Sequence, residues 1–524
     1  MRISRRDVQV VALALLLVGA AIGVGAYENR PGSGVVLWAP AAPLFADWLP
    51  HEGPGSLFAV MIAFAVVAWG PTLAGYLRWR VLLVVGYAVS VAWTFALAMI
   101  DGWHRGFADR LTNPNEYLHE VPGITDIPVM LRSFSSRILD FQPNSWTTHV
   151  SGHPPGATLV FVWLDRIGLG GGAWAAVACV LAGCLVTVAV PTTVATLREG
   201  RSFAGAGSGG ATRAGAGGAG FIAATAADSA TMGPATTTED ASGAPGAPTD
   251  GARLVPGAAT TTVGLAGRPG PARTTVPFVG GGLDPARAVV PFAVLFPGAV
   301  WVGVSADGLF AGVTAVGIAL LALGTRRPPW AFLGGAVLGF GAYLSYGLAL
   351  LALIAFAVTV AGRSLTRALP LAALGALAVA GVFTASGFWW LDGYHLVVER
   401  YYQGIASQRP YWYWVWANLA CLVLAAGPAL VAGARRVGVT LFAVREPGRW
   451  SHLRDPVLLL VAAAMLTIML ADVSGLSKSE VERIWLPFMV WLLPAVSLLP
   501  AHRWWLAAQA VTALAVNHLV LTYW

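Results

Sequence analysis

The stretch "HVSGHPPGATLVFVWLDRIGLGGG", residues 149–172, decides how the rest of the chain is threaded. It contains two histidines, a Pro-Pro pair, an apolar run with Asp165 and Arg166 near its end, and a glycine run. This stretch either crosses a membrane or enters and leaves it on the same side. The choice decides on which side of the membrane all later segments lie. The composition and the charge distribution of the whole chain distinguish these two cases.

The amino-acid composition indicates a membrane protein. Hydrophobic residues make up 57% of the 524 residues and charged residues only 11%, whereas soluble domains carry about 25% charged residues. Apolar segments of about twenty residues recur, which is the length that crosses a hydrocarbon core of roughly 30 Å. A large soluble helical protein would need charged outer faces on its helices, and these segments lack them. The composition therefore predicts an all-α polytopic membrane protein.

About thirteen crossings are predicted, although the two short segments around Tyr346 also allow a different count. The predicted crossings are residues 8–27, 55–76, 81–100, 172–197, 286–302, 305–323, 330–344, 346–362, 370–388, 412–433, 456–472, 485–499 and 504–522. With the N-terminus in the cytoplasm, the inside segments together with Arg287, at the start of the crossing 286–302, hold 22 of the 32 basic residues. The inside segments hold 9 of the 25 acidic residues. Because cytoplasmic loops are rich in Arg and Lys, this asymmetry predicts a cytoplasmic N-terminus and an extracytoplasmic C-terminus.

This orientation holds only if residues 153–170 do not cross the membrane. A full crossing here would place the arginine-rich loops 324–329, 363–369 and 434–455 outside. The sequence therefore predicts a re-entrant or interfacial helix over 153–170 on the extracytoplasmic side. Pro154 and Pro155 favour its first turn. Asp165 and Arg166 would be costly against lipid, so they are expected to face protein or water.

Composition also divides the chain into three parts. Residues 1–197 and 286–524 are expected to form an N-terminal and a C-terminal transmembrane part. Residues 198–285, with runs such as "GAGSGGATRAGAGGAG", are rich in Gly, Ala, Thr and Pro and have little to bury. They predict a disordered cytoplasmic linker, with a regulatory role as the alternative to a simple insertion.

The remaining features indicate the cellular compartment. The first apolar segment is longer than a typical signal-peptide core and is followed by further spans, which favours an uncleaved helix over a signal peptide. All three cysteines lie within predicted crossings, so no extracellular disulfide framework is expected. One lysine against 31 arginines is typical of a GC-rich bacterial genome. These features predict a bacterial plasma membrane.

The chemistry-bearing residues concentrate on the predicted outside, in loops 101–153, 389–411 and 473–484. These segments combine carboxylates, histidines, arginines and aromatic rings, and the outside segments hold six of the nine histidines. The alternative is a set of solvated loops with an aromatic belt at the membrane interface. The mixture on one side instead suits a site that holds a sugar and an anionic phosphate.

At this point the chain resembles the GT-C superfamily of membrane glycosyltransferases, which includes actinobacterial mannosyl- and arabinosyltransferases. The resemblance rests on the many crossings, the acidic first large outside loop, the "HPP" turn before a short helix, and the stretches "GVSADGLFAGVTAVG" and "GAVLGFGAYLSYGLALLAL". It implies a GT-C-like fold, a polyprenyl-phosphate sugar donor and an extracytoplasmic glycan, lipid or protein acceptor. The family's base is a carboxylate just beyond the first crossing. The match is Asp101 in "MIDGWHRG", which follows the third crossing, so Asp47 or Glu28 are alternatives.

The expected chemistry assigns roles to these residues. A base must take the acceptor proton, and cations must stabilise the leaving phosphate. The catalytic candidates are Asp101, Glu116 and Glu120. The substrate-binding candidates are His104, His149, His153, Asp392, Arg400, Arg409, Lys478, Glu480 and Arg483, of which the arginines and the lysine suit a phosphate.

Other classes of protein fit the sequence less well. A transporter or lipid flippase is the main alternative, but charges at mid-depth and a repeat of two halves, which would mark one, are not found. A scaffold protein would not need the carboxylates and histidines of 101–153. No metal site and no cofactor are expected, although a divalent cation near His149 and His153 remains an alternative. A lipid-linked sugar, membrane lipid and an envelope acceptor are the expected partners, and nucleic acid is not.

Overall fold

The computed structural model describes residues 3–208, 283–443 and 454–523. These residues are mostly helical and form one unit, in which a single two-stranded sheet is described. The all-helical class is therefore confirmed. Most of the predicted linker, and its predicted disorder, lies outside the described residues. Helix α8 continues to Ser208, past the predicted start of the linker at residue 198.

The described helices before residue 209 include the long helices α1, α2, α3 and α8 and several shorter ones. They are α1 (Arg5–Glu28), α2 (Gly55–Tyr76), α3 (Trp79–Ala98), α4 (Ile127–Ser133), α5 (Thr148–Gly152), α6 (Pro155–Arg166), α7 (Gly172–Gly183) and α8 (Val186–Ser208). Short 3₁₀ or π turns occupy His104–Ala108, Arg110–Thr112, Tyr117–His119, Val121–Gly123 and Ser135–Arg137. The large predicted loop is thus folded into short helical turns.

The second part of the chain supplies the remaining helices. They are α9 (Pro285–Val294), α10 (Ala299–Val302), α11 (Ala306–Gly324), α12 (Pro328–Leu344), α13 (Ala352–Ala361), α14 (Ala368–Ala385), α15 (Trp390–Gln403), α16 (Tyr411–Ala426), α17 (Pro428–Ala443), α18 (Pro456–Val473), α19 (Val481–Ile484), α20 (Leu486–Met489) and α21 (His502–Leu519). The 3₁₀ helices here are Tyr346–Leu351, Ile405–Ser407 and Val490–Leu498. Strand β1 (Ala46–Trp48) pairs antiparallel with β2 (Val520–Thr522).

Seven helices among the described residues are long and apolar enough to cross a membrane, or eight spans if one bent pair counts as a span. The predicted count of about thirteen is not confirmed. Predicted crossing 286–302 is interrupted at Pro297, between α9 and α10. Predicted crossing 412–433 bends by 111° between α16 and α17, where Gly427 has a φ of 86° that favours glycine. Apolar composition alone does not reveal such breaks.

Helix α6 corresponds to the quoted stretch. It begins at Pro155, because proline at the first helical position has no amide hydrogen to leave unpaired. Its 12 residues rise about 18 Å, which is short of the roughly 30 Å hydrocarbon core. The helix is too short to cross a membrane by itself.

Close backbone packing holds the later helices together. Gly335 in α12 lies so near α14 that an added Cβ would sit 1.9 Å from the carbonyl oxygen of Ala372. Four residues on, a Cβ at Gly339 would meet the Cα of Ala376 at 2.7 Å. Small residues spaced four apart let helices approach closely, as is common in membrane proteins. A larger residue at Gly335 would therefore push α12 and α14 apart.

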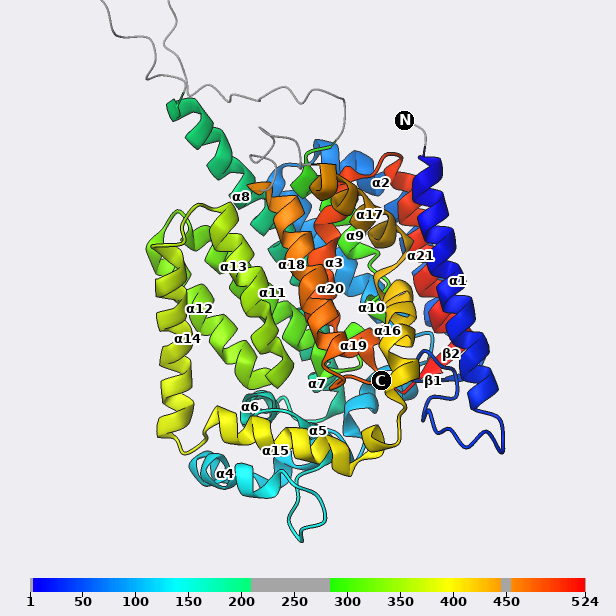
Figure 1. Cartoon of the computed structure of the whole chain (residues 1–524), viewed down its shortest axis with the longest axis vertical. Helices are drawn as coiled ribbons and strands as arrows, with labels where there is room; N and C mark the ends of the chain where they lie inside the picture. Colours follow the sequence, from blue (N-terminus) through cyan, green and yellow to red (C-terminus); the bar gives the residue numbers. More distant parts are fainter. Residues whose placement is uncertain (1–2, 209–282, 444–453, 524) are drawn as a thin grey trace, which may run out of the picture. The chain divides into compact units, whose positions relative to one another are not determined.

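Several short helices lie at one end of the described unit. Figure 1 shows α4, α5, α6 and α15 gathered at this end, which we call the loop end, and the start of α1 and the end of α8 at the opposite end. At that opposite end the fully buried Asp7 binds Arg435 at 2.5 Å and Arg436 at 2.6 Å, which ties α1 to α17.

Candidate functional site

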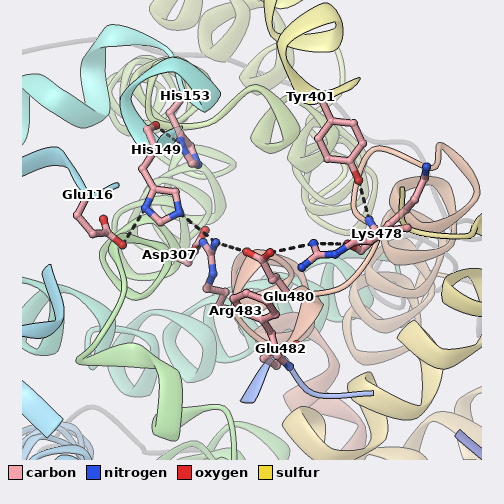
Figure 2. Close-up of polar contacts among 11 residues, drawn as sticks. Glu116, His149, His153, Asp307, Tyr401, Lys478, Glu480, Glu482 and Arg483 are labelled. Carbon is pink, nitrogen blue, oxygen red and sulfur yellow. Dashed lines mark hydrogen bonds and ion pairs between the residues drawn. The ribbon is translucent and has the colours of Figure 1, made fainter. Parts of the chain in front are cut away.

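Arg483, in α19 at the loop end, is the centre of a buried polar network. Its Nη1 lies 2.7 Å from Asp307 Oδ2 in α11, and its Nη2 lies 2.5 Å from Glu480 Oε2. The same Nη2 lies 3.3 Å from His149 Nε2 (Figure 2). Burying charges is expensive unless they are paired, and this guanidinium has carboxylates on two sides.

The network continues from Arg483 through His149 in α5. His149 Nδ1 lies 2.8 Å from Glu116 Oε1. With Nδ1–H donating to Glu116, the Nε2 lone pair accepts from Arg483, which is the arrangement of a neutral imidazole. His153 donates through Nδ1–H to the His149 carbonyl oxygen at 2.9 Å. The two histidines of the quoted stretch therefore lie together, and one of them links two charged groups.

On its other side the network reaches Arg409 and Lys478. Glu480 Oε1 accepts from Arg409 Nη1 at 2.9 Å, and the same Nη1 donates to the Lys478 carbonyl oxygen at 2.9 Å. The Lys478 amide donates to the Tyr401 hydroxyl at 3.0 Å. We call Glu116, His149, Asp307, Arg409, Glu480 and Arg483 the arginine–carboxylate cluster; most of it is drawn in Figure 2.

Several groups of this region have shifted pKa values. Burial alone would raise the pKa of Glu480, but the Arg483 and Arg409 guanidinium groups outweigh it and lower that pKa to about 2. Burial lowers the pKa of His153 to about 4, so its imidazole is neutral near pH 7. Burial and then the neighbouring Arg409 lower the pKa of Lys478. Two cations thus lie close enough to disfavour each other, which a bound anion would relieve.

The loop between α18 and α19 carries backbone strain at the cluster. Ser479 has a φ of 74° and Glu480 a φ of 64°, both in the left-handed region that non-glycine residues rarely adopt. Asn418 in α16 holds this loop: its Oδ1 accepts from the Ser479 amide at 3.3 Å, and its Nδ2 donates to the Ser477 carbonyl oxygen at 2.9 Å. Such strain persists only where the surroundings fix it, and it occurs often at functional sites.

Two groups of the cluster keep unused hydrogen-bonding capacity. Arg409 is only 4% exposed, yet its Nε and Nη2 are buried without a hydrogen-bond partner among the described residues. Together they form one edge of the guanidinium fork, which matches a carboxylate or a phosphate. Glu116 Oε2 is likewise buried with no partner in the described part of the chain. Leaving such groups unpaired costs about 1–3 kcal/mol or more each.

The cluster also contacts the segment that precedes β1. Glu482 Oε1 accepts from the Phe45 amide at 3.0 Å, and Cys421 Sγ donates to Glu482 Oε2 at 2.9 Å. Burial raises the pKa of Glu482. The Arg409 guanidinium lies 5.1 Å from the centre of the Phe45 ring. Residues far apart in the sequence are thus joined around one loop.

The structure places the remaining candidates in separate contacts. Asp101 Oδ1 lies 2.5 Å from His51 Nε2, and its Oδ2 lies 3.3 Å from Arg110. Glu120 accepts from the Thr147 amide at 3.0 Å and lies 3.5 Å from Arg137. Both carboxylates thus hold the loop end together.

Three further candidates lie outside the cluster. Arg400 binds Asp140 and donates to Ser151 Oγ at 3.2 Å. His104, 81% exposed, lies 3.3 Å from Asp109. Asp392 borders a cleft of about 460 Å³ with Ser135, Ser136, Leu139, Gln142, His395 and Leu396. The predicted roles of these residues, and those of Asp101 and Glu120, stay predictions.

Asp307 is the residue of the cluster that the sequence-based candidate set omits. It stands next to the start of an apolar run, in "GVSADGLF". A single acid at the edge of an apolar crossing is a signal in itself, because buried charges in membranes are rare and usually functional. Its partner, Arg483, lies 176 residues away in sequence, which no local pattern reveals.

Comparison with known proteins assigns no family to this chain, so the structure alone defines its fold class. Searches among protein-family models, curated proteins and solved structures each found no match to this chain. Within the described ranges, no group of three or more His, Cys, Asp or Glu side chains is placed to hold a metal ion. The long apolar helices define a helical, membrane-embedded protein with a buried polar network at one end.

Proposed function

We propose that this protein is a bacterial plasma-membrane glycosyltransferase that moves a sugar from a polyprenyl-phosphate donor to an extracytoplasmic cell-envelope acceptor. The observation that carries the proposal is the unpaired Nε–Nη2 edge of the buried Arg409. This edge suits a phosphate, which accepts two parallel hydrogen bonds from arginine. The proposal rests also on the GT-C-like features of the sequence.

The donor phosphate is assigned to Arg409 and Lys478. Glu480 and the Lys478 carbonyl oxygen hold Arg409 through Nη1, so the opposite edge keeps a fixed direction. Lys478 donates through Nζ to the Ala406 carbonyl oxygen at 3.0 Å and supplies a second positive charge. Cations aimed at the leaving phosphate stabilise the charge that develops as the sugar departs.

The acceptor proton is assigned to Glu116. Its Oε1 is held by His149, while its Oε2 has no partner among the described residues. In the reaction, an acceptor hydroxyl gives its proton to Glu116 Oε2, and its oxygen bonds to the anomeric carbon. The bond from that carbon to the phosphate oxygen breaks, and polyprenyl phosphate leaves with the bonding electron pair. Asp101, the base expected from the sequence, has both oxygens engaged by His51 and Arg110.

The acceptor is assigned to the cleft that Asp392 and His395 border. Its polar side chains offer both donors and acceptors, as a carbohydrate with many hydroxyls requires. In this arrangement the acceptor enters from the aqueous side of the loop end, and the lipid-linked donor enters from the membrane.

The orientation in the membrane follows from the positive-inside rule. We expect the loop end to be extracytoplasmic and the N-terminus to be cytoplasmic. In a cysteine-free background, the exposed residues Ser136 and Thr366 are each replaced by cysteine and treated with a membrane-impermeant maleimide. Ser136→Cys should be labelled in intact cells and Thr366→Cys only after lysis. The reverse pattern would show that the threading is inverted.

The function itself is tested with membranes that contain the protein at known levels. Labelled polyprenyl-phosphate mannose, arabinose and glucose are supplied in turn, and transfer to endogenous acceptors is measured against membranes without the protein. Protein-dependent transfer from one of these donors is the expected result. Movement of the intact lipid-linked sugar between leaflets without transfer would instead indicate the flippase alternative.

A further inference from the structure

A long apolar groove runs between α1 and α21. It has a volume of about 570 Å³, and its lining includes Val8, Leu15, Trp504, Val511, Ala515 and Leu519. The lining residues of α21 recur at three- and four-residue intervals, which places them on one face of the helix. The one threonine among the lining residues, Thr512, donates its hydroxyl to the Ala508 carbonyl oxygen at 2.9 Å. The groove therefore offers almost no polar contact.

The groove lies between two helices that share neighbours. Among the described contacts, α1 packs on α16 and α17, and α21 packs on α2, α16 and α17. The two helices α1 and α21 thus flank a trough, and Leu424 and Pro428 line it from α16 and the start of α17, beside the bend. Figure 1 shows α1 beside α21 over much of their length.

The length and width of the groove indicate which kind of molecule it can hold. From Val8 to Ile22 it follows α1 for 14 residues, or about 21 Å. Dividing the volume of about 570 Å³ by this length gives a cross-section of roughly 27 Å². A helix about 10–12 Å wide needs roughly 80–110 Å². Because apolar carbons touch at about 4.0–4.5 Å, one hydrocarbon chain needs roughly 20 Å². The groove fits a single chain.

One end of the groove reaches the arginine–carboxylate cluster. Pro43 and Leu44 line that end, and the next residue, Phe45, contacts both Glu482 and Arg409. A lipid whose chain lies in the groove would therefore place its head beside the unpaired edge of Arg409. An anionic head with one hydrocarbon chain fits both features.

We infer that the α1–α21 groove holds the hydrocarbon chain of a polyprenyl phosphate, with its phosphate at Arg409. This inference rests on the proposed function for the identity of the lipid. It adds the path of the chain, which runs from the loop end toward the buried Asp7. The groove thus fixes the donor by its tail as well as by its phosphate.

The test uses the full-length protein in detergent and a polyprenyl phosphate with a diazirine in its terminal isoprene unit. After irradiation, labelled peptides are mapped by mass spectrometry. The label should appear in α1 and α21, and excess polyprenyl phosphate should suppress it more strongly than the uncharged polyprenol. Ala515→Trp places an indole in the groove. It should reduce labelling at least about tenfold, because losing two buried methylene groups already removes about 1.6 kcal/mol.

The matched control is Ala378→Trp on α14, an exposed alanine on a helix that does not line the groove. It should leave labelling unchanged. Labelling spread over all apolar helices, labelling unaffected by Ala515→Trp, or a second polypeptide found in the groove would overturn the inference. Sugar transfer is measured on the same preparations. Labelling in the groove without transfer would overturn the proposed function alone, and transfer with labelling elsewhere would overturn the groove alone.

Discussion

Replacing Glu116 by Gln should abolish most sugar transfer while leaving the protein folded. Glutamine keeps the size of the side chain and a carbonyl oxygen for His149, but it cannot take a proton from the acceptor. Loss of a general base lowers rates by about a hundred- to ten-thousand-fold. The measurement is the transfer rate in proteoliposomes at matched protein levels, together with the affinity for polyprenyl phosphate, which should be nearly unchanged.

Asp101→Asn is the matched comparison for this variant. Because Asp101 binds His51 and Arg110, its loss should reduce thermal stability, while each folded molecule keeps most of its transfer rate. A normal rate in Glu116→Gln together with a large loss in folded Asp101→Asn would move the base to Asp101, as the sequence resemblance implies.

Replacing Glu480 by Ala should destabilise the protein by about 3–5 kcal/mol, the usual effect of removing one partner of a buried ion pair. Glu480 binds both Arg409 and Arg483, and its side chain is 14% exposed. The measurement is the free energy of unfolding from SDS titration in mixed micelles. Glu399→Ala, at an exposed position of α15, should change it by less than about 0.5 kcal/mol. A similar small change in both variants would show that the cluster does not stabilise the fold.

The same variant gives a pH dependence with a definite sign. The pKa of Glu480 is lowered from its ordinary value to about 2 by Arg483 and Arg409, which outweigh the effect of burial. A carboxyl with a lowered pKa stabilises the fold above its unfolded pKa, and this contribution is lost as the pH falls through the folded pKa. The difference in stability between wild type and Glu480→Ala should therefore be constant above pH about 5 and shrink toward pH about 2. A difference that grows on acidification would contradict the pairing.

Sequence patterns predicted the helical class and a short helix within residues 153–170 with Pro154 and Pro155 in its first turn, because composition and proline position act locally. Helix α6 runs from Pro155 to Arg166. The patterns did not predict the bend at Gly427 or the break at Pro297, since both lie inside apolar runs. Six substrate-binding candidates and Glu116 do meet in or beside one network, but their pairing depends on contacts between distant segments. Asp307 was missed because its neighbours in sequence are apolar.

Helix propensity also says little about which polar groups stay unpaired. Glu480 binds Arg409 through Nη1, which leaves the Nε–Nη2 edge without a partner among the described residues. The position of Glu480 depends in turn on its backbone, which adopts a φ of 64°. Such a conformation is imposed by surrounding contacts, here with Asn418 and Tyr401, and has no signature in the residues themselves. The site is thus defined by tertiary contacts made around a strained loop.

The central claim is that the protein consumes a polyprenyl-phosphate sugar. The most direct measurement uses purified protein in proteoliposomes with a donor labelled in both its sugar and its phosphate, and a cell-envelope glycan as acceptor. One polyprenyl phosphate should be released for each sugar transferred, and Arg409→Met should slow both in parallel. Transfer from a nucleotide sugar instead, or sugar incorporation without release of polyprenyl phosphate, would contradict the central claim.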